Sequence, residues 1–589
     1  MKKFFSKDNK LLFAAGINII ILIVCQFVFK LNFEILDEIV YSELIADGEK
    51  FTYFSNSFLI VIIGAIQKVI YPINAYAVFA LAVSLASMIT ISYIFFDKFD
   101  FYKALILTVL LNGFTATSHY SMISFTRNPA LLCTAGLLCI LHFIYKQKWL
   151  SGVIWGAVLV VVGSFYRFKV FAVVALVFVV YVLSITIVKH LEKDKKDYVK
   201  SFFKDLFEPK RLVCGILLVA VCCSCYYIHL SSISNSSELS YYSSYTKARS
   251  EIYDFYTPSY EECKEEYDAL GVDSEDLFFL DTMRFCDDKA YPLERLQKIG
   301  EVKNTVLSND SIVQVVINAV KNEASDALNK TDKAVLDLAV VIACLMFFIL
   351  FKKKYWITEI SLLLVSAFLY IYLHNLGRVL FRHAYIFWLP VIVFLMYTLD
   401  SNAINEKIKL LFKNIVKKVS LKKITALMLT FSIILTAGFS YAFWYKAKCQ
   451  DNGRFDQLRE LRSGISEYVK AHPDDRFELC KEANLFEGNI DNKSIYFINN
   501  EGRNGNSHIF QAIYYRLPYF NEFDKQIFGT NDLYGNLFNQ NVYYVDYNCW
   551  TSDHMKAHLQ KYYTDEGENV SYDIVDEVDS YQIVKFSKQ

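Results

Sequence analysis

Long apolar segments recur along most of the chain. Eleven of them are near 20 residues, long enough for a helix to cross a hydrocarbon core of roughly 30 Å. They cover residues 11–29, 75–96, 102–118, 128–145, 149–166, 170–188, 212–230, 334–351, 356–373, 381–398 and 424–444. The first is too long for a cleaved signal peptide, lacks an Ala-x-Ala site and leads into a charged loop. The pattern therefore predicts an α-helical polytopic membrane protein with about eleven transmembrane helices.

Lysines between these segments predict which loops face the cytoplasm, where Lys and Arg are enriched. They gather at the N-terminus and in the loops at 189–211, 352–354 and 407–423. The loop after the first span is acidic instead, so we expect it outside.

A further apolar run, residues 56–72, decides the topology. If it crosses the membrane, every later loop inverts and the lysine-rich loops fall outside. If it lies flat at the outer interface, all of these loops fall inside. We therefore predict an outer juxtamembrane helix, a cytoplasmic N-terminus and a cytoplasmic loop at 97–103.

Two water-soluble pieces remain, and both are expected outside. The loop 231–333 is predicted to be mainly helical. The tail after residue 445 is predicted to form a small α/β domain, with a helix at 454–472 and strands at 493–499, 541–548 and 580–586. The chain thus divides into an N-terminal transmembrane module (1–230), this loop (231–333), the C-terminal transmembrane helices (334–445) and a C-terminal extracytoplasmic domain (446–589).

Composition agrees with a membrane protein and excludes several functions. The chain is 54% hydrophobic and its formal net charge is zero, which argues against a nucleic-acid partner. It has no P-loop, no GxSxG elbow and no HExxH helix. Outside the membrane its cysteines show no zinc-like spacing. Cys263 can pair with Cys286, and Cys449, Cys480 and Cys549 can pair among themselves, or all of them can be free thiols.

The first candidate for chemistry is the carboxylate pair Asp37 and Glu38, just past the first span. Paired carboxylates can serve as a general base, a metal ligand or both. The alternative is that they are solvated acidic residues that follow the charge rule for outer loops.

The second candidate is a set of basic side chains predicted at the outer ends of spans. Arginine presents a planar fork of donors that matches phosphate, and ionisable groups at membrane depth are functional by default. Snorkelling to lipid headgroups is the alternative. The set comprises Arg127, Arg167, Lys169, Arg378, Arg382 and His383. His119 can line the same cavity or be an interfacial polar residue, and His374 is similar.

This layout resembles the GT-C superfamily of membrane glycosyltransferases. A first span, an acidic outer loop, an outer juxtamembrane helix, many spans and a C-terminal outer domain follow in the same order. The segments 68–96, 124–149 and 377–394 resemble the family's transition into the second span, its outer Arg segment and its late Arg- and Pro-containing span. Asn56-Ser57 stand near the position where many members have His-Pro-Pro.

The resemblance implies an enzyme that moves a sugar from a polyprenyl-phosphate donor to an acceptor on the outer face. In that reading Asp37 is the general base or holds a divalent metal ion, Mg²⁺ or Mn²⁺, with Glu38 beside it. The basic residues bind the donor phosphate, and the spans hold the lipid tail. The alternatives are a lipid-linked saccharide transporter or flippase, a polysaccharide polymerase or ligase, and a scaffold that has lost activity.

Overall fold

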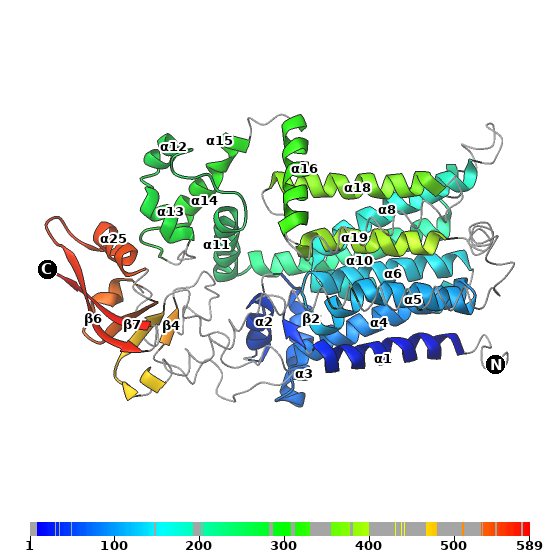
Figure 1. Ribbon diagram of the computed structural model, residues 1–589, viewed down its shortest axis with the longest axis horizontal. Coiled ribbons are helices and arrows are strands. Elements are labelled where there is room, and N and C mark those ends of the chain that lie inside the picture. Colours follow the sequence, from blue (N-terminus) through cyan, green and yellow to red (C-terminus); the bar gives the residue numbers. More distant parts are fainter. Residues whose placement is uncertain are drawn as a thin grey trace.

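The computed structural model consists of a helical bundle and a smaller module at one end of it (Figure 1). We call this the module end of the bundle; α1 (Lys10–Phe29) starts at the opposite end and finishes here. The structure describes residues 9–29, 31–33, 36–46, 48, 50–52, 54–146, 149–191, 202–203, 205, 207–281, 287–307, 312–329, 355–376, 381–399, 430, 438, 441, 467–469, 471–479, 509–511, 532, 534–547, 551–578 and 581–589.

The bundle is built from apolar helices, several of which are long enough to cross a membrane. Besides α1 it contains α4 (Ala75–Lys98), α5 (Phe101–Ala116), α6 (Arg127–Tyr145), α7 (Trp149–Tyr166), α8 (Phe168–His190), α10 (Pro209–Ser234), α18 (Trp356–Asn375) and α19 (Phe381–Thr398). Among the described residues, six helices meet both length and apolarity requirements for a span. The protein is therefore a multi-pass membrane protein. The predicted spans at 334–351 and 424–444 lie outside the described residues.

Close packing of α6 against α7 depends on two glycines. A Cβ atom on Gly136 would lie 2.5 Å from the carbonyl oxygen of Gly156, and one on Gly156 would lie 2.6 Å from that of Gly136. The two backbones therefore touch directly. Small residues permit such contacts between membrane helices, where dispersion forces drive association.

An ionic cluster closes the opposite end of the bundle. The Asp97 carboxylate, near the end of α4, accepts hydrogen bonds from Lys10 Nζ at 2.7 Å and from His142 Nε2 at 2.9 Å. Lys146 also contacts it. Three helices are thus joined at the end where the sequence predicts cytoplasmic loops.

Helix α3 (Ser57–Ile70) is the apolar run whose placement decides the topology, and both of its ends lie at the module end. At its start, the Asn56 amide donates to the Phe165 carbonyl at 2.8 Å. Near its end, Gln67 Oε1 accepts from the Ala75 amide at 2.7 Å, where α4 begins. Both ends of α3 are thus at the same end of the bundle, and Figure 1 shows α3 running across the bundle axis. That this segment lies flat at the outer interface stays a prediction.

The module combines helices from the middle of the chain with a sheet from its end. The helices are α11 (Ser237–Tyr253), α12 (Lys264–Ala269), α13 (Ser274–Asp281), α14 (Leu293–Glu301) and α15 (Lys303–Leu307). Helix α16 (Ile312–Asn329) follows them in the chain and packs against α18 of the bundle. The sheet has the order β4-β3-β5-β7-β6, formed by β4 (Ile509–Gln511), β3 (Arg476–Leu479), β5 (Val542–Tyr547), β7 (Tyr581–Lys588) and β6 (Val570–Val578). Helix α25 (Ser552–Tyr563) and the 3-10 helix η7 (Gly535–Phe538) complete it.

The predicted strands near 541–548 and 580–586 are β5 and β7, which pair in antiparallel fashion. The predicted strand 493–499 and most of the predicted helix 454–472 lie outside the described residues. Of the cysteines in the soluble pieces, Cys263 is a buried free thiol; Cys286, Cys449, Cys480 and Cys549 are outside the described residues.

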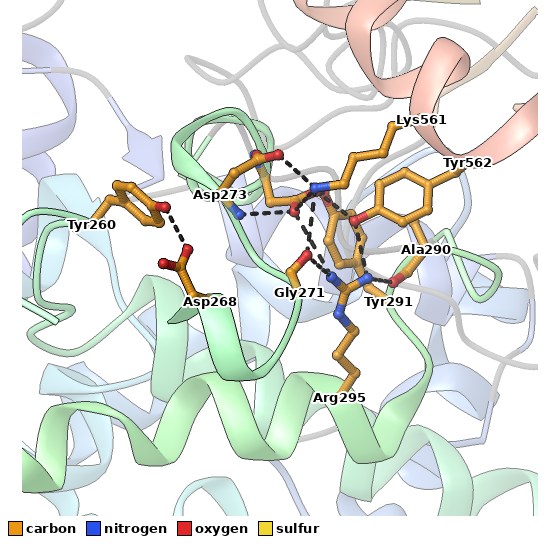
Figure 2. Close-up of polar contacts among 10 residues, drawn as sticks. Tyr260, Asp268, Gly271, Asp273, Ala290, Tyr291, Arg295, Lys561 and Tyr562 are labelled. Carbon is orange, nitrogen blue, oxygen red and sulfur yellow. Dashed lines mark hydrogen bonds and ion pairs between the residues drawn. The ribbon is translucent and has the colours of Figure 1, made fainter. Parts of the chain in front are cut away.

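The two pieces of the module share one hydrophobic core, although spans separate them in the sequence. Figure 2 shows part of their polar interface. Lys561 of α25 donates to Asp273 at 2.6 Å and to Asp276 at 2.7 Å. The Tyr562 hydroxyl donates to Asp276 at 2.8 Å and accepts from Arg295 at 3.0 Å. The sequence does not predict that the two pieces form one body.

Candidate functional site

The first loop of the chain is attached to the segment that precedes α6. Strand β1 (Asn32–Phe33) pairs in parallel with β2 (Met122–Ile123). Strand β2 follows a π-helical turn, η2 (Thr117–Ser121), at the end of α5. Helix α2 (Leu36–Ala46) begins directly after β1. This pairing places the start of α2, which includes Asp37 and Glu38, near residues 124–128, which we call the node segment.

The node segment is held in shape by its own serine. Ser124 Oγ accepts hydrogen bonds from the amides of Thr126, at 3.3 Å, and Arg127, at 3.2 Å. A hydroxyl that accepts from the first amides of a helix fixes its start. Pro129 in the first turn favours the same geometry. Arg127 is thereby placed at the first position of α6.

Glu38 is fully buried against this node segment. Its Oε1 accepts a hydrogen bond from the Phe125 amide at 3.1 Å. Its carboxylate also interacts electrostatically with Tyr76 and Tyr166, whose hydroxyls lie 3.1 Å apart. A buried carboxylate that holds a backbone amide supports the site from inside and is poorly placed to reach a substrate.

Asp37 is the second residue of α2, next to Glu38. Its backbone is described and its side chain is not. Its assignment as general base or metal ligand therefore stays a prediction. Among the described residues, no group of three His, Cys, Asp or Glu side chains is arranged to hold a metal ion.

Arg127 is buried and lies beside two other site residues. Its guanidinium carbon is 5.9 Å from the ring centroid of Tyr385, which belongs to α19. It also acts electrostatically on His119. A buried guanidinium at the N-terminus of a helix makes this part of the protein strongly favourable for an anion.

Arg167 lies between α7 and α8 and reaches the same node segment. Its guanidinium carbon lies 4.8 Å from the ring of Phe54 and 4.4 Å from that of Phe125. Its Nη1 donates to Thr126 Oγ1. The two rings and the hydroxyl fix the orientation of a cation that remains half-buried and partly open to solvent.

The predicted residues divide into those at the node segment and those elsewhere. Glu38, Arg127 and Arg167 meet there. Lys169 is exposed at the start of α8, whereas Arg382 and His383 are half-buried at the start of α19. The Nε atom of Arg382 is buried without a hydrogen-bond partner among the described residues. Arg378 lies outside the described residues, and His374 is half-buried near the end of α18.

Sequence reasoning misses several polar side chains at the site. Tyr385, Asn128 and the Tyr76–Tyr166 pair are buried around it. One signal was available for Tyr385, which follows Arg382 by three residues and so lies about one helical turn away. Asn128 directly follows Arg127 but carries no charge to draw attention.

Comparisons with known proteins give little beyond this geometry. No family model matches the chain, and no curated protein does. The solved structure of ArnT from Cupriavidus metallidurans bound to undecaprenyl phosphate is similar over 99% of this chain and 98% of that chain, with 10% identity and a TM-score of 0.35. Because the TM-score is low, the case for a function rests on the arrangement of the side chains.

Proposed function

We propose that this protein is a membrane glycosyltransferase of the GT-C type, which moves a sugar from a polyprenyl-phosphate donor to an acceptor hydroxyl at the outer face. The observation that carries this proposal is that Glu38, Arg127 and Arg167 meet at the node segment, with Asp37 next to Glu38 in α2. Two arginines at one membrane boundary favour a lipid-linked phosphate, whose apolar tail the surrounding spans can solvate.

The reaction assigned to this site is a displacement at the anomeric carbon. The acceptor oxygen forms a bond to that carbon while its proton passes to Asp37. The bond between the same carbon and the phosphate oxygen breaks, and the polyprenyl phosphate leaves with the electron pair. Arg167, partly open to solvent, binds the phosphate, and the buried charge of Arg127 stabilises the negative charge that develops on it. In an alternative form of the proposal, Asp37 would be a ligand of a divalent metal ion, which would supply Lewis-acid activation of the acceptor hydroxyl.

The placement of charged side chains favours transfer over transport. Ionisable groups in the described spans lie near helix ends, as Asp97, Arg127 and Lys189 do. Transporters and proton relays instead place such groups near the middle of the membrane.

Replacing the proposed base tests the function directly. We expect Asp37→Asn to abolish sugar transfer in membranes, because an amide cannot accept the acceptor's proton, while the protein remains expressed and folded. Transfer of radiolabelled sugar from a polyprenyl-phosphate donor is the measurement.

The matched control is Asp281→Asn, the same chemical change at an exposed position of the module. It should transfer sugar at the wild-type rate. Full transfer by Asp37→Asn would exclude both roles proposed for this carboxylate.

A further inference from the structure

His119 is a buried side chain that the proposed reaction leaves without a role. It sits in the π-helical turn η2, and both ring nitrogens have partners. Nδ1 lies 3.0 Å from Asn128 Oδ1, and Nε2 lies 2.9 Å from the Tyr385 hydroxyl. A π-helical turn inserts one residue into a helix and often marks a functional site, because it redirects a side chain.

The two hydrogen bonds fix the tautomer of a neutral His119. An amide oxygen can only accept, so Nδ1 carries the proton and donates to Asn128. Nε2 is then the acceptor, and the Tyr385 hydroxyl donates to it. The bond therefore anchors the far end of the Tyr385 side chain, and with it the orientation of its ring.

The anchored ring is the one that Arg127 contacts. The guanidinium carbon lies 5.9 Å from its centroid, and Arg127 also acts electrostatically on His119. Arg127 and Asn128 are consecutive residues of α6, so His119 holds this short segment on one side and Tyr385 on the other. Helix α19, far along the chain, is thereby connected to the start of α6.

We propose that His119 and Tyr385 are positioning residues that hold the Arg127 guanidinium in place for the phosphate of a lipid-linked ligand. This inference rests on the proposed function and adds to it two residues that act through Arg127. A merely structural alternative exists, in which the same bond only attaches α19 to the bundle. The two readings differ in whether the effect of breaking the bond depends on Arg127.

Binding of a polyprenyl phosphate to the full-length protein in nanodiscs, compared with the matching uncharged polyprenol, distinguishes them. We expect Tyr385→Phe to weaken polyprenyl-phosphate binding roughly fivefold, the effect of losing one neutral hydrogen bond, and to leave polyprenol binding unchanged. In an Arg127→Ala background, Tyr385→Phe should weaken binding no further. His119→Gln, whose side-chain oxygen can accept from Tyr385, should bind close to wild type, whereas His119→Ala should resemble Tyr385→Phe.

The matched control is Tyr181→Phe. The Tyr181 hydroxyl is also buried and also bonds α19, at Thr398, 3.0 Å away at the opposite end of the bundle. The Tyr181→Phe variant should bind polyprenyl phosphate as tightly as the wild type. Equal weakening by Tyr181→Phe and Tyr385→Phe, undiminished weakening by Tyr385→Phe in the Arg127→Ala background, or no effect of Tyr385→Phe would overturn the inference. If the wild-type protein binds polyprenyl phosphate no better than polyprenol, the proposed function itself fails.

Discussion

Glu38, the neighbour of the proposed base Asp37, has a structural contact of its own. Glu38 is fully buried and accepts the Phe125 amide, so its charge stabilises the node segment. Hydrogen bonds to charged groups contribute about 1.5–3 kcal/mol each, and neutral ones about 0.5–1.5 kcal/mol. Asp37→Asn and Glu38→Gln should therefore have different effects on sugar transfer.

We expect Glu38→Gln to retain transfer at roughly a fifth of the wild-type rate, because the amide oxygen still accepts from Phe125 and only the charge is lost. Glu38→Ala should lower both transfer and thermal stability, since it leaves a buried backbone amide unpaired. Transfer assays and thermal unfolding in nanodiscs measure the two effects. If Glu38→Gln is as inactive as Asp37→Asn, Glu38 itself takes the acceptor's proton.

Among individual residues, the charged side chains of the candidate site could be predicted from the sequence, and the neutral ones could not. Arg127 and Arg167 stand out in the sequence because few basic residues fall on the predicted outer side. The neutral residues around them carry no comparable signal. Tyr385 and Asn128 matter through contacts between α19, η2 and α6, and these contacts depend on three-dimensional packing. The burial of Glu38 could not be predicted either, since it follows from the pairing of two-residue strands.

At the scale of the helix, the length of an apolar segment predicts the spans but not the other helical elements. A span needs only an apolar segment of sufficient length, so the described spans fall near their predicted bounds. The π-helical turn η2 follows α5 directly, and no sequence pattern distinguishes its residues from those of the preceding helix. The flat placement proposed for α3 is predicted only by lysines in distant loops.

Helix α3 leaves one apolar face uncovered by protein. Phe58, Ile62, Ile66 and Val69 are exposed along it, whereas Leu59 and Ile63 are buried. A flat helix at the interface would turn this face toward lipid. Its two ends should then lie at the same depth.

Nitroxide labels at Phe58→Cys and Val69→Cys, in a background free of reactive thiols, test this placement. We expect oxygen dissolved in the lipid to enhance the spin relaxation of both labels equally. A water-soluble nickel chelate should enhance it only weakly. A label at Glu238→Cys, an exposed position on α11, is the aqueous control. In a crossing helix the two α3 labels would differ in depth by about 16 Å. A large difference between them in relaxation enhancement would contradict the flat placement.

On the scale of the whole molecule, a buried pair joins the two pieces of the module. His558 Nε2 lies 2.6 Å from Asp287 Oδ2, and the Tyr563 hydroxyl donates to Oδ1 at 2.7 Å. Burial alone would raise the pKa of Asp287. Hydrogen bonds from His558, the Ala290 amide and Tyr563 outweigh it and hold the pKa below its ordinary value.

The sign of the pH dependence follows from this lowered pKa. The pair contributes its full stability above the unfolded pKa of an aspartate, about 3.9, and loses it as the pH falls through the lower folded value. Asp287→Asn should therefore weaken docking of α25 at neutral pH by about 3 kcal/mol, as expected when one partner of a buried pair is removed. It should also abolish the acid-induced loss of docking.

Hydrogen–deuterium exchange of α25 in the full-length protein measures this docking. Protection should fall in Asp287→Asn and remain unchanged in Asp288→Asn, the same substitution at the exposed neighbouring residue. Equal protection in the two variants would show that the pair does not hold the pieces together.

The shared core of the module also has a consequence for biosynthesis. Residues 237–307 are synthesised before the late predicted spans, so their partner α25 does not yet exist when they leave the ribosome. Phe279, Asp276 and Asp287 are buried in the finished protein but belong to an incomplete module until α25 has been synthesised and has docked. A premature stop codon after the last span would leave the bundle inserted and this apolar surface uncovered, open to membrane proteases and chaperones.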